Sequence, residues 1–261
     1  MELLPVEKYK VFSDNDDSSR VTFVMGAREI PICDFFNDYP PLIRYVDLSE
    51  LDGNLLIKPH NPQDLIISEE FFDVWEWVGV DITKESIWKN GIKREESVQW
   101  YVAQEYINNG YDIVFDDDGA NEAADLVCIK NHDDHIELVL IHCKFSGGAN
   151  AGARIKDVVE VTSQAIRSAK WPGEFKKLCK HILDRNHKRS KSLGQNFFLN
   201  GAGKDVTKMS KASRFKTIKT KVVIAQPGIS KANLTNDQKS VLAAGSTYLK
   251  ETLNIDLEII C

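Results

Sequence analysis

The fold expected for this chain is decided by two apolar stretches, Ala123-Ala124-Asp125-Leu126-Val127-Cys128-Ile129 and Leu138-Val139-Leu140-Ile141-His142-Cys143-Lys144. Each stretch has the length and composition of a buried β-strand. The short polar segment 131–135 between them is typical of a hairpin-like connection. The two stretches therefore predict neighbouring strands, with Asp125 near the end of one and Lys144 near the end of the other.

Helix and strand patterns on either side extend this pair into a larger sheet. Upstream, residues 94–108 have apolar side chains at helical spacing, and residues 111–115 predict a strand. Downstream, the sequence predicts a helix over 155–171, another over 174–185, a basic loop over 186–213, a strand over 221–226, a helix over 236–252 and a strand over 255–260. This order indicates an α/β fold, with a mixed central sheet flanked by helices on both faces.

Residues 1–90 have a different pattern, which predicts a small β-rich N-terminal unit. The β-rich run 20–25 is followed by turn signals at 31, 40–41, 52–54 and 59–62. The aromatic stretch 71–77 predicts either a short helix or a strand that docks this unit onto the next. We therefore expect two domains, 1–90 and 91–261, with a basic insertion over 172–217 in the second.

Composition places the 261-residue chain among ordinary globular proteins, with 43% apolar and 28% charged residues. It has no run of about 18 apolar residues and no N-terminal secretory pattern, so we expect a cytoplasmic protein without a membrane partner. The five cysteines are an odd number and lack C-x-x-C spacing. They indicate reduced thiols, not disulfides or a zinc site.

The net charge of −6 hides a strong asymmetry along the chain. Residues 167–221 contain 16 Lys/Arg and three acids, a balance of +13, and the remainder carries −19. Such a segment predicts an electrostatic contact with nucleic acid, and the alternative is a solvated loop. Its position directly after the candidate site favours nucleic acid, with candidate contacts at Arg167, Lys170, Lys188, Arg189 and Lys191.

Asp125 and Lys144 form the skeleton of a metal-dependent phosphodiesterase site. A carboxylate in an apolar run is costly to bury without compensation, and Mg²⁺ or Mn²⁺ would supply it. Lys144 would then orient the attacking water or stabilise charge on the phosphate. The alternatives are that Asp125 only caps a turn and that Lys144 reaches out to solvent. The pairing of the two residues favours the functional interpretation.

His142 stands where a second acid would be expected, two residues before Lys144 and on the same face of the strand. It can ligate a metal, which would shift the preference from Mg²⁺ towards Mn²⁺. It can also act as an acid or base, or hold Asp125 by a hydrogen bond. The carbonyl group of Cys143 is a further candidate ligand.

Helical positions supply the remaining candidates. Glu96, or less favourably Glu95, begins the first helix and would restore a second carboxylate to the metal; the alternative is an acid that only favours the helix dipole. Gln164 and Arg167 lie on the helix after the second strand. They would contact the scissile phosphate or groups around the metal, unless they are simply exposed polar residues.

These elements and residues resemble the PD-(D/E)XK, or restriction-endonuclease-like, nuclease core over roughly residues 93–226. The chain is also similar, over nearly its whole length, to the C-terminal region of bacterial helicase–nuclease proteins of restriction and anti-phage type. The stretches that carry this likeness are 75–82, 115–119, 142–146 and 226–230. The chain departs from the family pattern at Ala124, where the family has proline, and at His142, where it has an acid.

The resemblance implies an Mg²⁺- or Mn²⁺-dependent deoxyribonuclease that acts in bacterial restriction or anti-phage defence. The implied partners are DNA, in the form of a duplex or a displaced strand, a helicase domain or subunit, and a second copy of the chain. The alternative is a degenerate nuclease fold that only binds DNA or a partner. The expected catalytic set is Asp125, His142, Lys144, Glu96 and Gln164, and the expected metal ligands are Asp125, His142, Glu96 and the Cys143 carbonyl.

Overall fold

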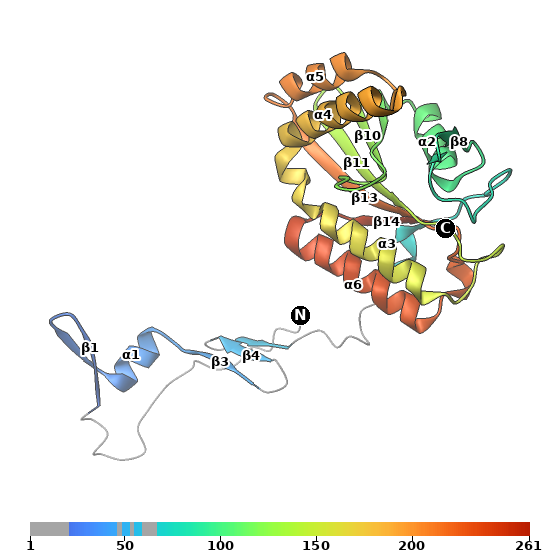
Figure 1. Cartoon of the computed structure of the whole chain (residues 1–261). Coiled ribbons are helices and arrows are strands. Elements are labelled where there is room, and N and C mark those ends of the chain that lie inside the picture. Colours follow the sequence, from blue (N-terminus) through green and yellow to red (C-terminus); the bar gives the residue numbers. More distant parts are fainter. Residues whose placement is uncertain (1–20, 46–48, 53–54, 59–66) are drawn as a thin grey trace. The chain divides into compact units, whose positions relative to one another are not determined.

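The computed structural model describes residues 21–45, 49–52, 55–58 and 67–261 (Figure 1). The chain divides into two compact units, Met1–Asp64 and Leu65–Cys261. The boundary therefore lies well before the expected residue 90, because residues 67–90 supply an edge strand and the buried Ile87 to the second unit. The turn signals at 53–54 and 59–62 lie outside the described residues.

The described part of the first unit is made of short strands and one helix. The first two strands form a hairpin, and the other three form a second antiparallel sheet. Gly26 lies in the hairpin turn with a φ of +66°, a conformation that glycine adopts without strain. The elements are β1 (Thr22–Met25), β2 (Arg28–Pro31), α1 (Ile32–Asp38), β3 (Leu42–Arg44), β4 (Glu50–Asp52) and β5 (Leu55–Ile57).

The second unit is built on a seven-stranded mixed sheet, which confirms the expected α/β class. The strand order is β12-β9-β10-β11-β13-β14-β6. The pairs from β12 to β11 are antiparallel, and the pairs from β11 to β6 are parallel. Their bounds are β6 (Phe72–Asp73), β9 (Ile113–Asp116), β10 (Leu126–Asn131), β11 (His135–Cys143), β12 (Phe198–Asn200), β13 (Thr217–Ala225) and β14 (Leu257–Ile260).

Helices cover both faces of this sheet, as expected. In Figure 1, α3 and α6 lie side by side along one part of it, and α4 and α5 lie together along another. The helices are α2 (Val98–Asn108), α3 (Ile155–Arg167), α4 (Phe175–Leu193), α5 (Gly203–Ala212) and α6 (Asn236–Leu253). Smaller elements are the hairpin of β7 (Trp88–Lys89) and β8 (Ile92–Lys93), and the 3₁₀ turns η3 (Glu69–Phe71), η4 (Ser168–Lys170), η5 (Pro172–Glu174) and η6 (Lys231–Asn233).

Alternating residues of the strands point to opposite faces of the sheet and pack in an apolar layer on each face. Val223 and Ala225 of β13 pack in a cluster with α2, whereas Val222 and Ile224 pack with α3 and α6. Leu140 of β11 is paired with Val222 and packs in the cluster that contains α4 and α5. Burying each such side chain contributes about 1.5–3 kcal/mol, so this alternation fixes which helices cover which face.

The basic stretch 186–213 is largely regular structure, so the expectation of a loop there is wrong. Helix α4 continues to Leu193, where Gly194 ends it with a φ of +69°. Strand β12 then joins the edge of the sheet, and α5 follows. Gly201 is required between them, because a Cβ at this position would lie 2.4 Å from the carbonyl oxygen of Asp112. Helix α4 continues beyond Arg185 because tertiary contacts hold its second half, such as the hydrogen bond of 2.7 Å from Arg189 to the carbonyl oxygen of Asp116.

The aromatic stretch 71–77 forms a strand and not a helix where it joins the sheet. Its β6 residues pair in parallel with Ile259 and Ile260 of β14 at the sheet's edge. No helix in the described part of the chain is both long and apolar enough to cross a membrane.

Candidate metal centre at the strand ends

Asp125 is a buried carboxylate placed directly before β10. Its Oδ2 atom accepts a hydrogen bond of 2.7 Å from the backbone N–H of Cys143, which ties the start of β10 to the end of β11. Burial raises the pKa of Asp125 well above its usual value, and the negative charges of Asp118, Glu122 and Glu85 act in the same direction. Such a carboxylate gains strongly from a nearby cation.

Two further acids in the loop between β9 and β10 approach Asp125. Carboxylate oxygens of Asp118, Glu122 and Asp125 all lie within 4.8 Å of one another. Burial raises the pKa of Glu122, although its Oε2 atom accepts a hydrogen bond of 2.7 Å from Gly119. Carboxylates at this separation repel each other unless a proton or a cation lies between them. Their hard oxygen atoms are the ligands that Mg²⁺ and Mn²⁺ prefer.

Helix α4 holds this acidic loop in place. The buried Asp117 accepts a hydrogen bond of 2.6 Å from the backbone N–H of Ala123 and forms an ion pair with Arg185. Arg185 also donates to the carbonyl oxygen of Ala120 at 2.6 Å. One turn further along α4, Arg189 donates to the carbonyl oxygen of Asp116 at 2.7 Å. These contacts fix the backbone from which Asp118 and Glu122 project.

Lys144 follows β11 and is fixed by two carboxylates. Its Nζ atom lies 2.8 Å from Glu160 Oε1 on α3 and 3.2 Å from Glu85 Oε2. The side chain is only 8% exposed, so the alternative of a lysine that reaches solvent is wrong. Burial lowers the pKa of Lys144, but the two carboxylates more than offset this and leave the pKa raised. The ammonium group is therefore charged at neutral pH.

Glu85 is a site residue that the sequence did not indicate. It precedes β7, and its Oε2 atom accepts a hydrogen bond of 3.1 Å from the backbone N–H of Phe145 as well as pairing with Lys144. Burial raises the pKa of Glu85. The buried Gln99 positions this segment through two hydrogen bonds of 3.1 Å. Its side-chain Oε1 atom accepts from the backbone N–H of Ile87, and its backbone N–H donates to the carbonyl oxygen of Glu85.

His142 is buried beside this group of acids without a hydrogen bond. Its Nδ1 atom lies 3.9 Å from Asp125 Oδ2, too far for the hydrogen bond considered above. Neither ring nitrogen has a hydrogen-bond partner among the described residues. Burial lowers the pKa of His142 to about 3, and the charge of Arg167 acts in the same direction. The imidazole is therefore neutral at physiological pH and keeps a free lone pair for a ligand.

The glutamates at the start of the first helix do not join the acidic group. Glu96 is 42% exposed and pairs with Lys84 at 2.8 Å, while Glu95 pairs with Lys93 at 2.9 Å. Helix α2 begins at Val98, after both acids, so they lie on the preceding turn rather than on the helix. Asp118 and Glu122, and not Glu96, thus bring carboxylates close to Asp125, and Glu96 forms a surface ion pair.

The other expected site residues lie around Lys144 and His142. Gln164 and Arg167 share one stripe of α3 with Glu160, since they follow it by four and seven residues. The Oε1 atom of Gln164 is buried and lacks a hydrogen bond within the described residues. Cys143 contributes its backbone N–H to Asp125, while its thiol packs in the apolar cluster that contains α2.

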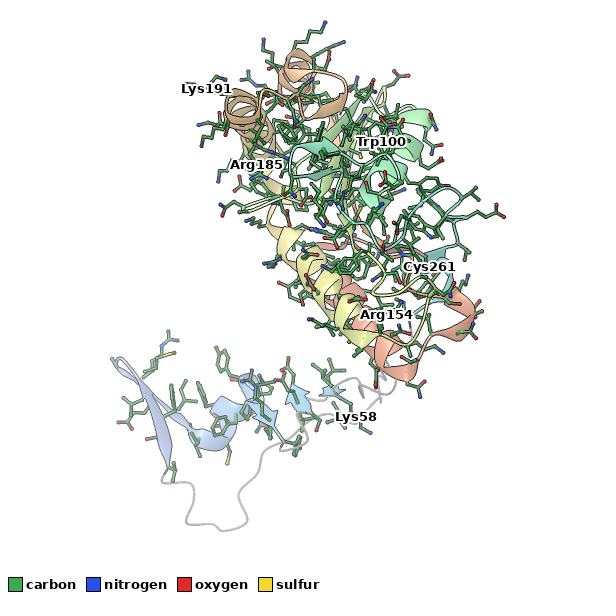
Figure 2. All side chains as sticks on the ribbon, turned by 45° about the vertical axis from the view of Figure 1, so that its right-hand side comes forward. Lys58, Trp100, Arg154, Arg185, Lys191 and Cys261 are labelled. Carbon is green, nitrogen blue, oxygen red and sulfur yellow. The ribbon has the colours of Figure 1, made fainter. Side chains whose placement is uncertain are left out.

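The predicted nucleic-acid contacts differ in how far they are free to bind. Arg167, Lys170, Lys188 and Lys191 are exposed, and Figure 2 shows Lys191 projecting from the same helix as Arg185. Arg189 is instead engaged within the protein. Besides its bond to the Asp116 carbonyl, its guanidinium lies 3.6 Å from the ring centre of Phe197.

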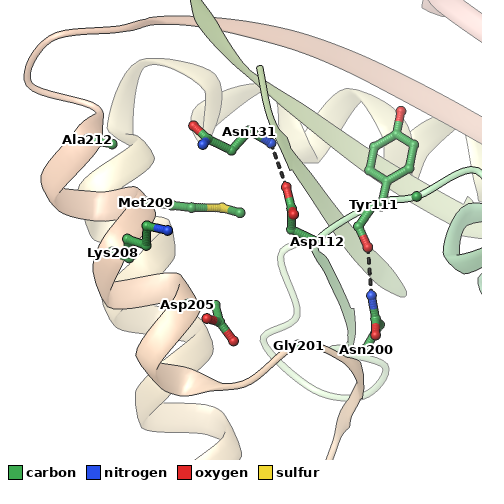
Figure 3. A pocket seen from close by; sticks show the side chains of 10 residues that line it. Tyr111, Asp112, Asn131, Asn200, Gly201, Asp205, Lys208, Met209 and Ala212 are labelled. Carbon is green, nitrogen blue, oxygen red and sulfur yellow. Dashed lines mark hydrogen bonds between the residues drawn. The ribbon is translucent and has the colours of Figure 1, made fainter. Parts of the chain in front are cut away.

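A separate cavity of about 420 Å³ lies between α5 and the start of β9 (Figure 3). Within it Asn200 donates to the carbonyl oxygen of Tyr111 at 2.7 Å, and Asp112 accepts from the N–H of Asn131 at 2.8 Å. It is at the opposite end of β9 from Asp116 and contains none of the expected site residues.

Comparison with known proteins does not add a relative. No family model, no curated protein and no solved structure matches this chain. The class of the second unit is accordingly defined by its own structure, as an α/β protein with a mixed sheet flanked by helices and a carboxylate cluster at the strand ends.

Proposed function

We propose that this protein is a metal-dependent nuclease that hydrolyses phosphodiester bonds in DNA on a restriction-endonuclease-like core. The observation that carries the proposal is one juxtaposition at the ends of β10 and β11. Three carboxylates with oxygens within 4.8 Å of one another lie at the start of β10, and the charged Lys144 follows the end of β11. Glu85 connects the two, because it pairs with Lys144 and its charge acts on Asp118 and Asp125. Acids that hold a cation, next to a fixed ammonium group, are suited to attack on a phosphodiester.

The residues present fit a hard divalent cation. Asp118, Glu122 and Asp125 would supply oxygen ligands; burial raises the pKa values of Asp125 and Glu122, and neighbouring acids act in the same direction, so a cation would stabilise their charged forms. The free imidazole of His142 is a second, independent indication, because a buried polar side chain otherwise has a partner. When bound, Mg²⁺ or Mn²⁺ would polarise the phosphate and lower the pKa of a bound water.

The side chains around this cluster have separable roles. Glu85 and Glu160 hold the ammonium of Lys144 in one position, where it can stabilise charge that develops on the phosphate. With a pKa of about 3, His142 is unprotonated at neutral pH and is too weak a base for general acid–base catalysis there. A ligand role, or orientation of a neighbouring group, therefore suits His142 better than proton transfer.

The basic surface supports DNA as the substrate. Arg167 and Lys170 end α3 and its 3₁₀ continuation, and Lys188 and Lys191 lie on the exposed side of α4. Contacts of this kind bind phosphates without reading sequence. Restriction or anti-phage defence, together with a helicase domain or subunit as partner, belongs to the same proposal through the family resemblance.

Two observations favour a second candidate, a degenerate nuclease fold that only binds DNA or a partner. An imidazole occupies the position of the family's second strand acid, and Lys144 is paired with two carboxylates instead of being free. This candidate predicts salt-dependent DNA binding that does not depend on divalent ions or on Asp125.

Plasmid cleavage separates the two candidates. We expect the wild-type protein to nick supercoiled plasmid with Mg²⁺ or Mn²⁺, and Asp125→Asn and Lys144→Ala to be slower by roughly 10²- to 10³-fold. Matched controls are Asp237→Asn and Lys239→Ala, two exposed residues of α6, which should nick like wild type. Equal nicking by all five proteins would trace the activity to a contaminant and remove the support for a nuclease.

A further inference from the structure

The loop between α5 and β13 carries an aromatic side chain that packing does not explain. Phe215 is 90% exposed. A single exposed apolar residue is ordinary on a protein surface. Two properties of its surroundings, a rigid backbone and a concentration of positive charge, distinguish this one.

The backbone around Phe215 is held on both sides. Its N–H donates to the carbonyl oxygen of Ala212 at 2.9 Å, which closes the end of α5. The Nζ atom of the next residue, Lys216, donates to Asn131 Oδ1 at 2.9 Å and to the carbonyl oxygen of His132, so the loop is tied to the β10–β11 turn. The aromatic ring is thus presented to solvent from a fixed backbone, which lowers the entropy lost on binding.

Positive residues lie near Phe215 along the chain and on the neighbouring helix α4. Lys211 and Arg214 are exposed immediately before it. The first turn of α4 is also close, because Phe175 and Lys176 line a shallow cavity of about 300 Å³ together with Ser213 and Ile218. From there α4 presents a row of exposed lysines, namely Lys176, Lys177, Lys180, Lys188 and Lys191.

Helix α4 connects this loop with the candidate metal centre. Its first turn lies beside Ser213, while Arg185 and Arg189 hold the loop that carries Asp118. Lys176 and Arg189 are 13 positions apart, which corresponds to about 20 Å of helix. Helix α4 therefore carries five exposed lysines and one exposed acid, Asp184, a net positive surface that runs from the Phe215 loop towards the acidic loop.

We propose that Phe215 and the cations around it form a binding surface for single-stranded nucleic acid, with the ring stacked on an unpaired base. Every unpaired base offers a face for such stacking, and Lys or Arg side chains follow its phosphates. Bases in a duplex are already stacked on one another, so Phe215 would add nothing to duplex binding. The surface is distinct from the metal centre and needs no divalent ion.

Fluorescence anisotropy in EDTA tests this surface without cleavage. The probes are a labelled single strand of about 16 nucleotides and the duplex of the same sequence. Phe215→Ala should weaken single-strand binding by roughly 5- to 150-fold and leave duplex binding unchanged, whereas Phe215→Trp should retain both. Val78→Ala, at a residue that is 76% exposed, is the matched control and should bind like wild type. Arg214→Ala should reduce the slope of log K against log salt by about 0.7, and Phe215→Ala should not change it.

Three results would overturn the proposal. The first is an equal affinity of Phe215→Ala and wild type for the single strand, and the second is an equal loss of affinity by Phe215→Ala for strand and duplex. The third is a Phe215→Ala variant that no longer binds anionic phospholipid vesicles but still binds the single strand as wild type does. The last result would identify a membrane surface instead. Because the assay contains no divalent ion, a protein that fails to cut plasmid can still pass it, and the reverse also holds.

Discussion

At the scale of single residues, Asp125 and Lys144 have opposite electrostatic surroundings. Lys144 lies within 3.2 Å of two carboxylates, so its charge is matched inside the protein. Asp125 is buried among further acids, and its carboxylate accepts a hydrogen bond from the N–H of Cys143. Burial and these acids therefore favour the protonated form of Asp125 unless a cation lies nearby, which is the physical basis for expecting a cation at the start of β10.

Asp125→Asn is expected to stabilise the metal-free protein at mildly alkaline pH. Because burial raises the pKa of Asp125, the folded state binds a proton more tightly than the unfolded state. The stability that this tighter proton binding gives to the folded state is lost progressively as the pH rises above the unfolded-state pKa of about 3.9. The asparagine removes the penalty and keeps an acceptor for Cys143.

Melting temperatures in EDTA across the pH range check this expectation. The variant should melt several degrees higher at alkaline pH, at about 2–4 °C per kcal/mol, and the two proteins should converge as the pH approaches about 4. Asp237→Asn, at an exposed position, should follow wild type throughout. A variant that melts lower than wild type at every pH would contradict the account of Asp125.

At the scale of elements, α4 links the basic surface to the acidic loop. It buries Leu178, Cys179 and Ile182 against the sheet and uses Arg185 to hold the buried Asp117. The sequence predicted the first part of this helix from its apolar spacing. It did not predict the remainder, since the residues after Arg185 are mostly polar and their helix is stabilised by tertiary contacts with the β9–β10 loop.

Arg185→Ala should destabilise the protein by about 1–3 kcal/mol, because the buried Asp117 carboxylate loses its guanidinium partner and keeps only the Ala123 N–H and His181 Nε2. Urea unfolding measures the change. Lys188→Ala, at an exposed position on the same helix, is the control and should stay within about 0.5 kcal/mol of wild type. Equal stability of the two variants would show that α4 does not hold the acidic loop.

At the scale of the whole second unit, the mixed sheet and most of the order of helices and strands were predictable from local periodicity, whereas β12 and α5 were not. Asp125 and Lys144 were predictable too, since a charge inside an apolar run is visible in the sequence. Glu85 was not, because tertiary packing alone brings it to Lys144 from a segment expected in another domain. Asp118 and Glu122 were not predicted either, because only the folded loop brings their carboxylates close to Asp125.

Isothermal titration calorimetry with Mn²⁺ tests the central claim most directly, because it measures metal binding without a DNA substrate. The account predicts saturable binding to the wild-type protein, weakened by roughly 10- to 100-fold or more in Asp125→Asn and in Asp118→Asn. Asp237→Asn, an exposed control on α6, should bind as wild type does. No binding by the wild-type protein, or unchanged binding in Asp125→Asn, would contradict a metal centre at the ends of β10 and β11.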